Sequence, residues 1–315
     1  MEKTVKKKKL LRIYKNPEKL KAPRTERQLP LAFNSNEIIT FIDSNLYSHV
    51  ILNNLLKNTV VELLGIGDND KDNYAYFNPN SVYIKLLEEY QLNTKFKRIC
   101  KSGNIHHHIS NNCKNFSNWY KKLIFHLIGP HIVRKFIDED EEENDVSIEK
   151  EFTVLYQFPP TIRVYNSHLI DTKNKDIKNN HGITYKNLGK MHCDSVFGHQ
   201  IGEVNFWMPL TPTHPTSTLY AETSPGKADW YPFHPLHPGS IMRFPGTFCR
   251  HKTKPNISGK TRVSIDFRCS MSTCFDKDYQ GRAITSRRHQ MLEAVYKTTP
   301  AIASSKREVH FLSGA

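Results

Sequence analysis

The fold is indicated most clearly by the stretch Arg262-Val263-Ser264-Ile265-Asp266-Phe267-Arg268 (RVSIDFR). Its even-numbered residues are polar or charged, and its odd-numbered residues are Val, Ile and Phe. Because successive side chains of a strand point to opposite faces, this pattern predicts a β-strand with one apolar and one polar face. Two guanidiniums, a carboxylate and a hydroxyl are unusual on a face inside a sheet protein. They fit a face that lines a polar cavity for an anionic ligand, because Arg pairs bidentately with a carboxylate.

Five further runs that are typical of β-strands precede this stretch in the sequence, and no helical pattern separates the later ones. Pro and Gly separate these runs, which are rich in aromatic and β-branched residues: FTVLYQF (152–158), TIRVY (161–165), EVNFWMPL (203–210), STLYAE (217–222) and GSIMRF (239–244). Strands that follow one another without helices favour an antiparallel sandwich or barrel over a parallel α/β sheet. With the helical pattern that precedes them, they predict an α+β protein.

The chain divides into four predicted segments. Residues 1–30 form a basic, disordered arm, and residues 31–150 form a mainly helical region that ends in an acidic loop. Residues 151–280 form a β core that carries the chemistry, and residues 281–315 form a C-terminal extension. Apolar residues recur at helical spacing from Ile51 to Leu64 and from Phe116 to Leu127. We expect Gly129-Pro130 to kink or end the second helix. The polar residues 166–190 are expected to form a long loop.

The formal net charge of +14 is concentrated near the N-terminus. Residues 1–30 hold eleven Lys or Arg against three Glu, a local excess of +8. A solvated tail, a nuclear address and a polyanion-binding arm all fit this segment, so nucleic acid remains a candidate partner. No run approaches the length of a membrane span, and the six cysteines form no CxxC pair. We therefore expect no membrane partner and a cytoplasmic protein, with a nuclear location as the alternative that Lys6–Lys9 allow. The oligomeric state is not indicated.

A candidate metal site comprises His192, Asp194 and His251. His192-Cys193-Asp194 is a His-x-Asp pair, His251 follows fifty-nine residues after His192, and Arg262 lies eleven residues further on. Two histidines and one carboxylate on one face are typical of non-haem Fe(II) oxygenases, because they leave three coordination positions open. Two of these suit 2-oxoglutarate and the third suits dioxygen. Arg262 then lies where the far carboxylate of 2-oxoglutarate needs a cation.

The segment from His192 to Arg268 resembles the 2-oxoglutarate/Fe(II)-dependent oxygenases, and is most similar to the dioxygenases of streptomycin-type biosynthetic clusters. The closer resemblance rests on the residues of GHQ (198–200), GEVNFW (202–207), PLT (209–211), Glu222, PG (225–226) and RVSIDFR (262–268). It implies a double-stranded β-helix (jelly-roll, cupin-like) core with the helical region packed on it. It also implies Fe(II) on His192, Asp194 and His251, with 2-oxoglutarate on Arg262. The implied reaction hydroxylates a substrate C–H with O2 as co-substrate and releases succinate and CO2.

Several polar residues beside the predicted site are candidates for ligand contacts. Ser264 shares the polar face of Arg262, and we assign it to 2-oxoglutarate. Glu203 and Asn205 share a strand face, where they fit a polar or cationic substrate, hydrogen bonds to 2-oxoglutarate, or a merely polar outer face. We assign Asn205 to the cofactor. The candidates for substrate contact are Glu203, Trp207, Glu222 and Arg268.

Three functions fit these residues. The first is a dioxygenase that hydroxylates a polar small molecule such as an amino acid or amino sugar. The second is an AlkB-like nucleic-acid demethylase, since Arg262 and Arg268 have the Arg-x5-Arg spacing of that family and the basic arm would add affinity for phosphates. Against it, the Asn-x-Tyr segment of that family is missing, and residues 166–190 offer only Tyr185 for stacking a base. The third is a non-enzymatic metal-binding β-barrel.

Overall fold

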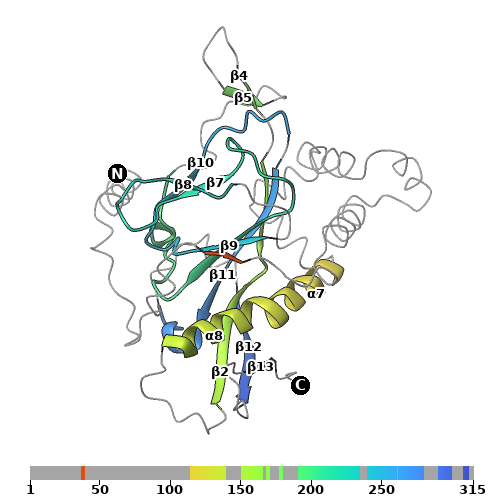
Figure 1. The fold of residues 1–315 in the computed structure, drawn as a ribbon, viewed down its shortest axis with the longest axis vertical. Helices are drawn as coiled ribbons and strands as arrows, with labels where there is room; N and C mark the ends of the chain where they lie inside the picture. Colours follow the sequence, from red (N-terminus) through yellow and green to blue (C-terminus); the bar gives the residue numbers. More distant parts are fainter. Residues whose placement is uncertain are drawn as a thin grey trace, which may run out of the picture.

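The computed structural model contains helices and antiparallel sheets, in agreement with the predicted α+β class (Figure 1). It describes residues 37–39, 114–139, 150–165, 168–170, 177–179, 191–234, 240–260, 262–279, 290–299 and 308–311. The predicted basic arm 1–30, the helix predicted from Ile51 to Leu64 and most of the acidic loop lie outside these residues. Among the helices that the structure describes, none is both long and apolar enough to cross a membrane.

The major sheet has eight strands, and every pairing in it is antiparallel. Its order is β1 (Glu37–Ile39), β9 (Ile241–Phe244), β6 (Val204–Pro209), β11 (Arg262–Met271), β2 (Lys150–Phe158), β12 (Gln290–Thr299) and β13 (Glu308–Phe311). The eighth strand, β3 (Thr161–Tyr165), also pairs with β11. The break between β2 and β3 falls at Pro159-Pro160, as predicted, because proline cannot donate to a strand ladder.

Two smaller sheets complete the β-structure of the described residues. β10 (His251–Thr253) pairs with β7 (Leu219–Ala221), which pairs with β8 (Tyr231–Pro232). β4 (His168–Ile170) and β5 (Ile177–Asn179) form a hairpin within the stretch 166–190, for which we expected only loop. The apolar residues Leu169, Ile170 and Ile177 lie in its strands, and their small number explains why the polar composition around them concealed the hairpin.

A helical layer lies across β2 and β12 (Figure 1). α7 (Lys114–Leu123) runs into a π-helical turn, η4 (Ile124–Ile128), and then into α8 (Gly129–Glu139). The predicted interruption at Gly129-Pro130 is therefore a change of helix type and not an end. The Gly129 amide donates to the carbonyl of Ile124, five residues back, and the hydroxyl of Tyr296 donates to the same carbonyl at 3.2 Å. Pro130 lacks an amide hydrogen, which is tolerated at the start of a helix.

The central strands of the major sheet are buried on both faces. Phe206 and Met208 of β6 and Ile265 and Phe267 of β11 pack in one apolar cluster with the helices. On the opposite face Trp207 of β6 packs with residues of β7 and β9 in a second cluster: Leu219, Ala221, Met242 and Phe244. The polar face of β11 thus lies on the side of the major sheet that the smaller sheet β10-β7-β8 covers. A polar site buried between two sheets follows from this arrangement.

Residues 281–315, which we expected to form a C-terminal extension beyond the β core, contribute β12 and β13 to the major sheet. β12 pairs with β2 along nine residues, from Gln290 opposite Phe158 to Thr298 opposite Lys150. Its run QMLEAVYKTT has the β-branched and aromatic residues of a strand. The strands in the described residues form open sheets and no closed barrel, so the jelly-roll arrangement stays a prediction.

We predict that Gly129→Ala destabilises the protein by about 1–3 kcal/mol, the usual cost of overpacking a core. A Cβ at this position would lie 1.9 Å from the hydroxyl oxygen of the fully buried Tyr296. This clash outweighs the gain of about 1 kcal/mol that Ala normally brings to a helix. Urea denaturation measures the effect. Asn118→Ala, at an exposed position of α7, is the matched control, and equal stability of the two variants would contradict the predicted clash.

Candidate metal centre

His192, Asp194 and His251 are brought together by backbone pairing between two distant segments. His192 and His251 form an antiparallel bridge, in which each amide donates to the carbonyl of the other residue at 3.1 and 2.9 Å. Asp194 opens the 3-10 helix η5 (Asp194–Phe197), and its amide donates to the Gly246 carbonyl at 2.9 Å. The turn before β10 therefore positions the His-x-Asp segment and the second histidine together.

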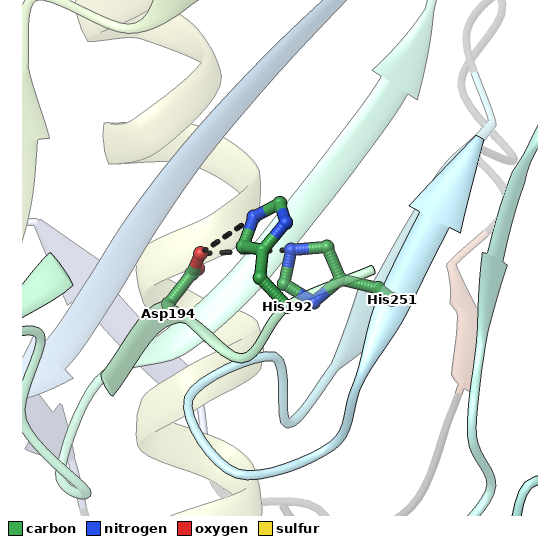
Figure 2. Close-up of side chains that lie close together, drawn as sticks. All are labelled: His192, Asp194 and His251. Atoms are coloured by element: carbon green, nitrogen blue, oxygen red, sulfur yellow. Dashed lines mark ion pairs between the residues drawn. The ribbon is translucent and has the colours of Figure 1, made fainter. Parts of the chain in front are cut away.

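The three side chains point toward one another (Figure 2). Oδ1 of Asp194 lies 3.7 Å from Nε2 of His192 and 3.5 Å from Nε2 of His251. One ligand atom from each residue falls within 4.8 Å of the others, which is compact enough for a single metal ion. Nδ1 of His251 lies 3.3 Å from the carbonyl of Cys249, a contact that fixes the ring and turns Nε2 toward the site.

Oδ2, the second oxygen of Asp194, is occupied by protein donors. It accepts hydrogen bonds from Nε and Nη2 of Arg268 at 2.9 and 2.6 Å and from Nδ2 of Asn205 at 2.5 Å. Burial would raise the pKa of Asp194, but the charges of Arg268 and His251 outweigh it and hold the pKa well below its usual range. Asp194 is thus a carboxylate, although only 2% of it is exposed.

The donor set fits a divalent transition metal. Two imidazole nitrogens and one carboxylate oxygen suit iron, manganese or zinc, and the ligands come from one side. Burial raises the pKa of both nearby thiols, Cys193 and Cys249, to about 12, and the compact group of ligand atoms among the described residues contains neither of them. Nothing in the donor set selects iron over another metal of this group.

Arg262 and Ser264 lie buried on the same face of β11, as predicted. The guanidinium carbon of Arg262 lies 5.0 Å from the ring centre of Tyr165 and 5.4 Å from that of Trp207. Ser264 Oγ and Asn205 Oδ1 are buried and have no hydrogen-bond partner among the described residues. Because buried polar atoms normally have partners, these two atoms favour a polar ligand that the chain itself does not supply.

The four predicted substrate residues lie in different surroundings. Trp207 packs against Arg262 and the apolar cluster, and Arg268 binds Asp194. Glu203 precedes β6 and accepts hydrogen bonds within its own turn, at 2.7 Å from Nδ1 of His199 and 2.9 Å from the Gln200 amide. The structure therefore places Arg268 and Asn205 beside the metal ligand, and surrounds Glu203 with local partners.

Glu222 lies at the pairing of β7 with β10. It is fully buried and accepts hydrogen bonds from Nε of Arg250 at 2.8 Å and from the amides of Arg250 and Ala228 at 2.9 and 2.8 Å. Burial would raise its pKa, but the bonds from Arg250 and from the Ala228 amide outweigh it and lower the pKa below 4.5. Glu222 thus anchors the strand that carries His251.

Two residues near the site were missed by the sequence interpretation. Gln157 of β2 accepts a hydrogen bond from Nη1 of Arg268 at 2.9 Å, and its place as the one amide in the apolar run FTVLYQF was the available signal. Gly246 accepts the hydrogen bond from the Asp194 amide and packs against Asn205, where a Cβ would lie 2.7 Å from Cγ of Asn205. Only the tertiary structure brings this glycine to Asn205.

We predict that Glu222→Gln lowers the free energy of unfolding at pH 7 by about 1.5–3 kcal/mol, the usual worth of hydrogen bonds to a charged group. Because folding lowers the pKa of Glu222 from 4.5, its stabilisation is present above that value and is lost as the pH falls through the folded-state pKa. The difference from wild type should shrink in urea denaturation at acid pH. Glu293→Gln is the control, since Glu293 forms an exposed pair with Lys277; a pH-independent deficit in Glu222→Gln would contradict the prediction.

No protein-family model matches this chain. The chain is similar to the streptomycin biosynthesis protein StrG of Streptomyces griseus, with 35% identity over 81 residues. The matched stretch covers 26% of this chain and 37% of StrG, so the chain spans little more than a third of the length of that relative. This partial similarity does not by itself identify a reaction.

Proposed function

We propose that this protein is an Fe(II)- and 2-oxoglutarate-dependent dioxygenase that hydroxylates a polar small molecule. The observation that carries the proposal is the cluster of His192, Asp194 Oδ1 and His251, with Arg262 and Ser264 buried on the strand that also carries Arg268. A metal-binding protein without enzymatic activity needs the cluster but has no need of a buried cation for a dicarboxylate. The similarity to a streptomycin biosynthesis protein also favours a biosynthetic enzyme.

The fold proposed for this activity is a double-stranded β-helix. Two antiparallel sheets enclosing a site between them are what this fold requires. The bridge between His192 and His251, the first residue of β10, adds a contact between the His-x-Asp segment and the smaller sheet. The helices α7 and α8 support the opposite face of the major sheet and leave the site side to β7, β8 and β10.

In this proposal His192, Asp194 and His251 hold the iron. When bound, iron with 2-oxoglutarate supplies the activation of O2, with succinate and CO2 as the products of the co-substrate. The chain contributes the orientation of its ligands: Cys249 holds the ring of His251 through its carbonyl, and the turn at Gly246 holds the backbone of Asp194. Because the chain supplies three ligands, the bound metal would keep positions open for both the co-substrate and O2.

Arg262 and Ser264 would bind the distal carboxylate of 2-oxoglutarate. The guanidinium of Arg262 supplies two parallel donors, and the Ser264 hydroxyl supplies a third. The rings of Tyr165 and Trp207 beside Arg262 exclude water, which strengthens the ion pair because the local dielectric is low. A dicarboxylate fits this arrangement better than a neutral ligand would.

The substrate would approach from the side of His192. The side chain of His192 is 25% exposed, against 9% for His251, and its ring contacts Phe197, which is 42% exposed. An amino acid, amino sugar or similar polar metabolite is the substrate class that we propose, and the chemistry suits a reducing cytoplasm.

Purified protein should release succinate from 2-oxoglutarate when Fe(II) and O2 are present, and Asp194→Ala should abolish this release by removing a metal ligand. A screen of polar metabolites, with succinate measured by mass spectrometry, would also identify the substrate by stimulation of turnover. Anaerobic protein should bind 2-oxoglutarate only together with Fe(II). Wild-type protein that binds the metal but neither binds 2-oxoglutarate nor forms succinate would leave the metal-binding barrel as the remaining explanation.

We predict that Arg262→Gln raises the KM for 2-oxoglutarate about 10- to 100-fold, equivalent to losing about 1.5–3 kcal/mol of hydrogen bonds to a charged group. Fe(II) affinity should stay within about twofold, because Arg262 is not among the metal ligands. Steady-state succinate assays at varied 2-oxoglutarate measure the change. Arg134→Gln removes an exposed guanidinium from α8, on the opposite side of the major sheet, and is the matched control; an unchanged KM in Arg262→Gln would assign the cofactor site elsewhere.

A further inference from the structure

Donors from two neighbouring strands converge on one oxygen of Asp194. Asn205 of β6 and Arg268 of β11 lie directly opposite each other in the antiparallel register, so their side chains are adjacent on the same face. Together they give Oδ2 three hydrogen bonds, at 2.5, 2.6 and 2.9 Å. Both of these donor residues and Asp194 itself are buried.

Arg268 is itself held in place by the next strand. Its Nη1 donates to Oε1 of Gln157 at 2.9 Å, and Nε2 of Gln157 donates to the Pro159 carbonyl at 3.1 Å. The hydroxyl of Tyr120, from α7, donates to the backbone carbonyl of Gln157 at 2.7 Å. The guanidinium therefore has one fixed orientation, with Nε and Nη2 directed at Asp194.

Asn205 is confined in a similar way by Gly246. A Cβ on Gly246 would lie 2.7 Å from Cγ and 2.9 Å from Nδ2 of Asn205, so the amide packs directly on the glycine. The same glycine accepts the hydrogen bond from the Asp194 amide. The backbone of Asp194 and the donor to its side chain are thus aligned by one residue.

We propose that Arg268 and Asn205 are positioning residues that occupy Oδ2 of Asp194 and leave Oδ1 as its single metal-binding atom. A carboxylate has about four lone-pair sites, and three hydrogen bonds on Oδ2 leave none there for a metal. A metal bound by both oxygens would break charge-assisted bonds to a buried guanidinium. Oδ1, in contrast, is the oxygen that lies nearest to both histidines.

The proposal rests on the proposed function only in requiring a metal ion at this centre. The new element is that Arg268 and Asn205, which would not contact the metal, determine how many of its coordination positions stay open. A one-oxygen aspartate keeps three positions open in an octahedral centre, whereas a two-oxygen aspartate would occupy one of them. The loss of such orienting partners typically weakens metal affinity 10- to 100-fold.

The test measures Mn(II) affinity of the purified protein without 2-oxoglutarate, by electron paramagnetic resonance of the free ion. Arg268→Gln should weaken Mn(II) binding about 10- to 100-fold, and Arg268→Lys should restore only part of it, since one ammonium cannot replace two aligned donors. In Co(II)-loaded protein the visible absorption, which reports coordination number, should change in Arg268→Gln. Arg134→Gln, which removes an exposed guanidinium from α8 on the opposite side of the major sheet, should keep wild-type Mn(II) affinity.

Two variants that change the site less test the same role if Arg268→Gln does not fold. Asn205→Ala removes one donor, and Gly246→Ala displaces Asn205 while both donors stay in the sequence. Each should weaken Mn(II) binding and change the Co(II) spectrum. Wild-type affinity and an unchanged spectrum in the folded variants would overturn the positioning role. Wild-type protein that binds no Mn(II) or Fe(II) would contradict both proposals, whereas tight metal binding without succinate would contradict only the dioxygenase activity.

Discussion

The ion pair between Asp194 and Arg268 is the interaction on which the rest of the site depends. Both side chains are buried, and removing two charges from water costs more than their attraction returns unless further hydrogen bonds complete them. Asn205 and Gln157 provide these bonds from the two strands that flank β11. The pair therefore requires three adjacent strands in one register, and a slip by one residue would turn both donors to the apolar face.

The same register explains why the major sheet is buried on both sides. Phe267 and Phe206 stack against each other on the helix side, 5.3 Å apart, while Arg268 and Asn205 meet on the side of the site. Packing of α7 and α8 thus fixes the strands that carry the polar residues. Tyr120 joins the two sides directly, since its ring contacts Phe267 and its hydroxyl binds the backbone of Gln157. Through Gln157 and Arg268, helix α7 thus supports Asp194, although α7 lies on the opposite side of the major sheet.

Sequence reasoning predicted the parts of this arrangement that depend on local pattern. Alternation in RVSIDFR placed Arg262, Ser264 and Arg268 on one face, and the His-x-Asp pair identified two residues of the metal cluster. It did not predict partners, because alternation gives the face of a residue and not the neighbouring strand. Pairing of β7 with β10 joins Glu222 to Arg250, and pairing of β6 with β11 takes Asn205 and Arg268 to Asp194. The strands at 290–299 and 308–311 were missed for the same reason, since only the pairing of β12 with β2 and of β13 with β12 places them in the sheet.

Stability alone does not explain why this chain keeps a buried Asp194–Arg268 pair. Replacing such a pair by apolar residues of similar volume is often neutral or stabilising, and the surrounding clusters are already apolar. The contacts are instead divided between the two oxygens: Oδ2 of Asp194 accepts the hydrogen bonds from Arg268 and Asn205, while Oδ1 lies 3.7 and 3.5 Å from the Nε2 atoms of His192 and His251. A structural ion pair has no need of that division. A carboxylate that presents one oxygen to a metal does need it, so the proposed metal centre would account for a buried Asp194–Arg268 pair that stability alone does not explain.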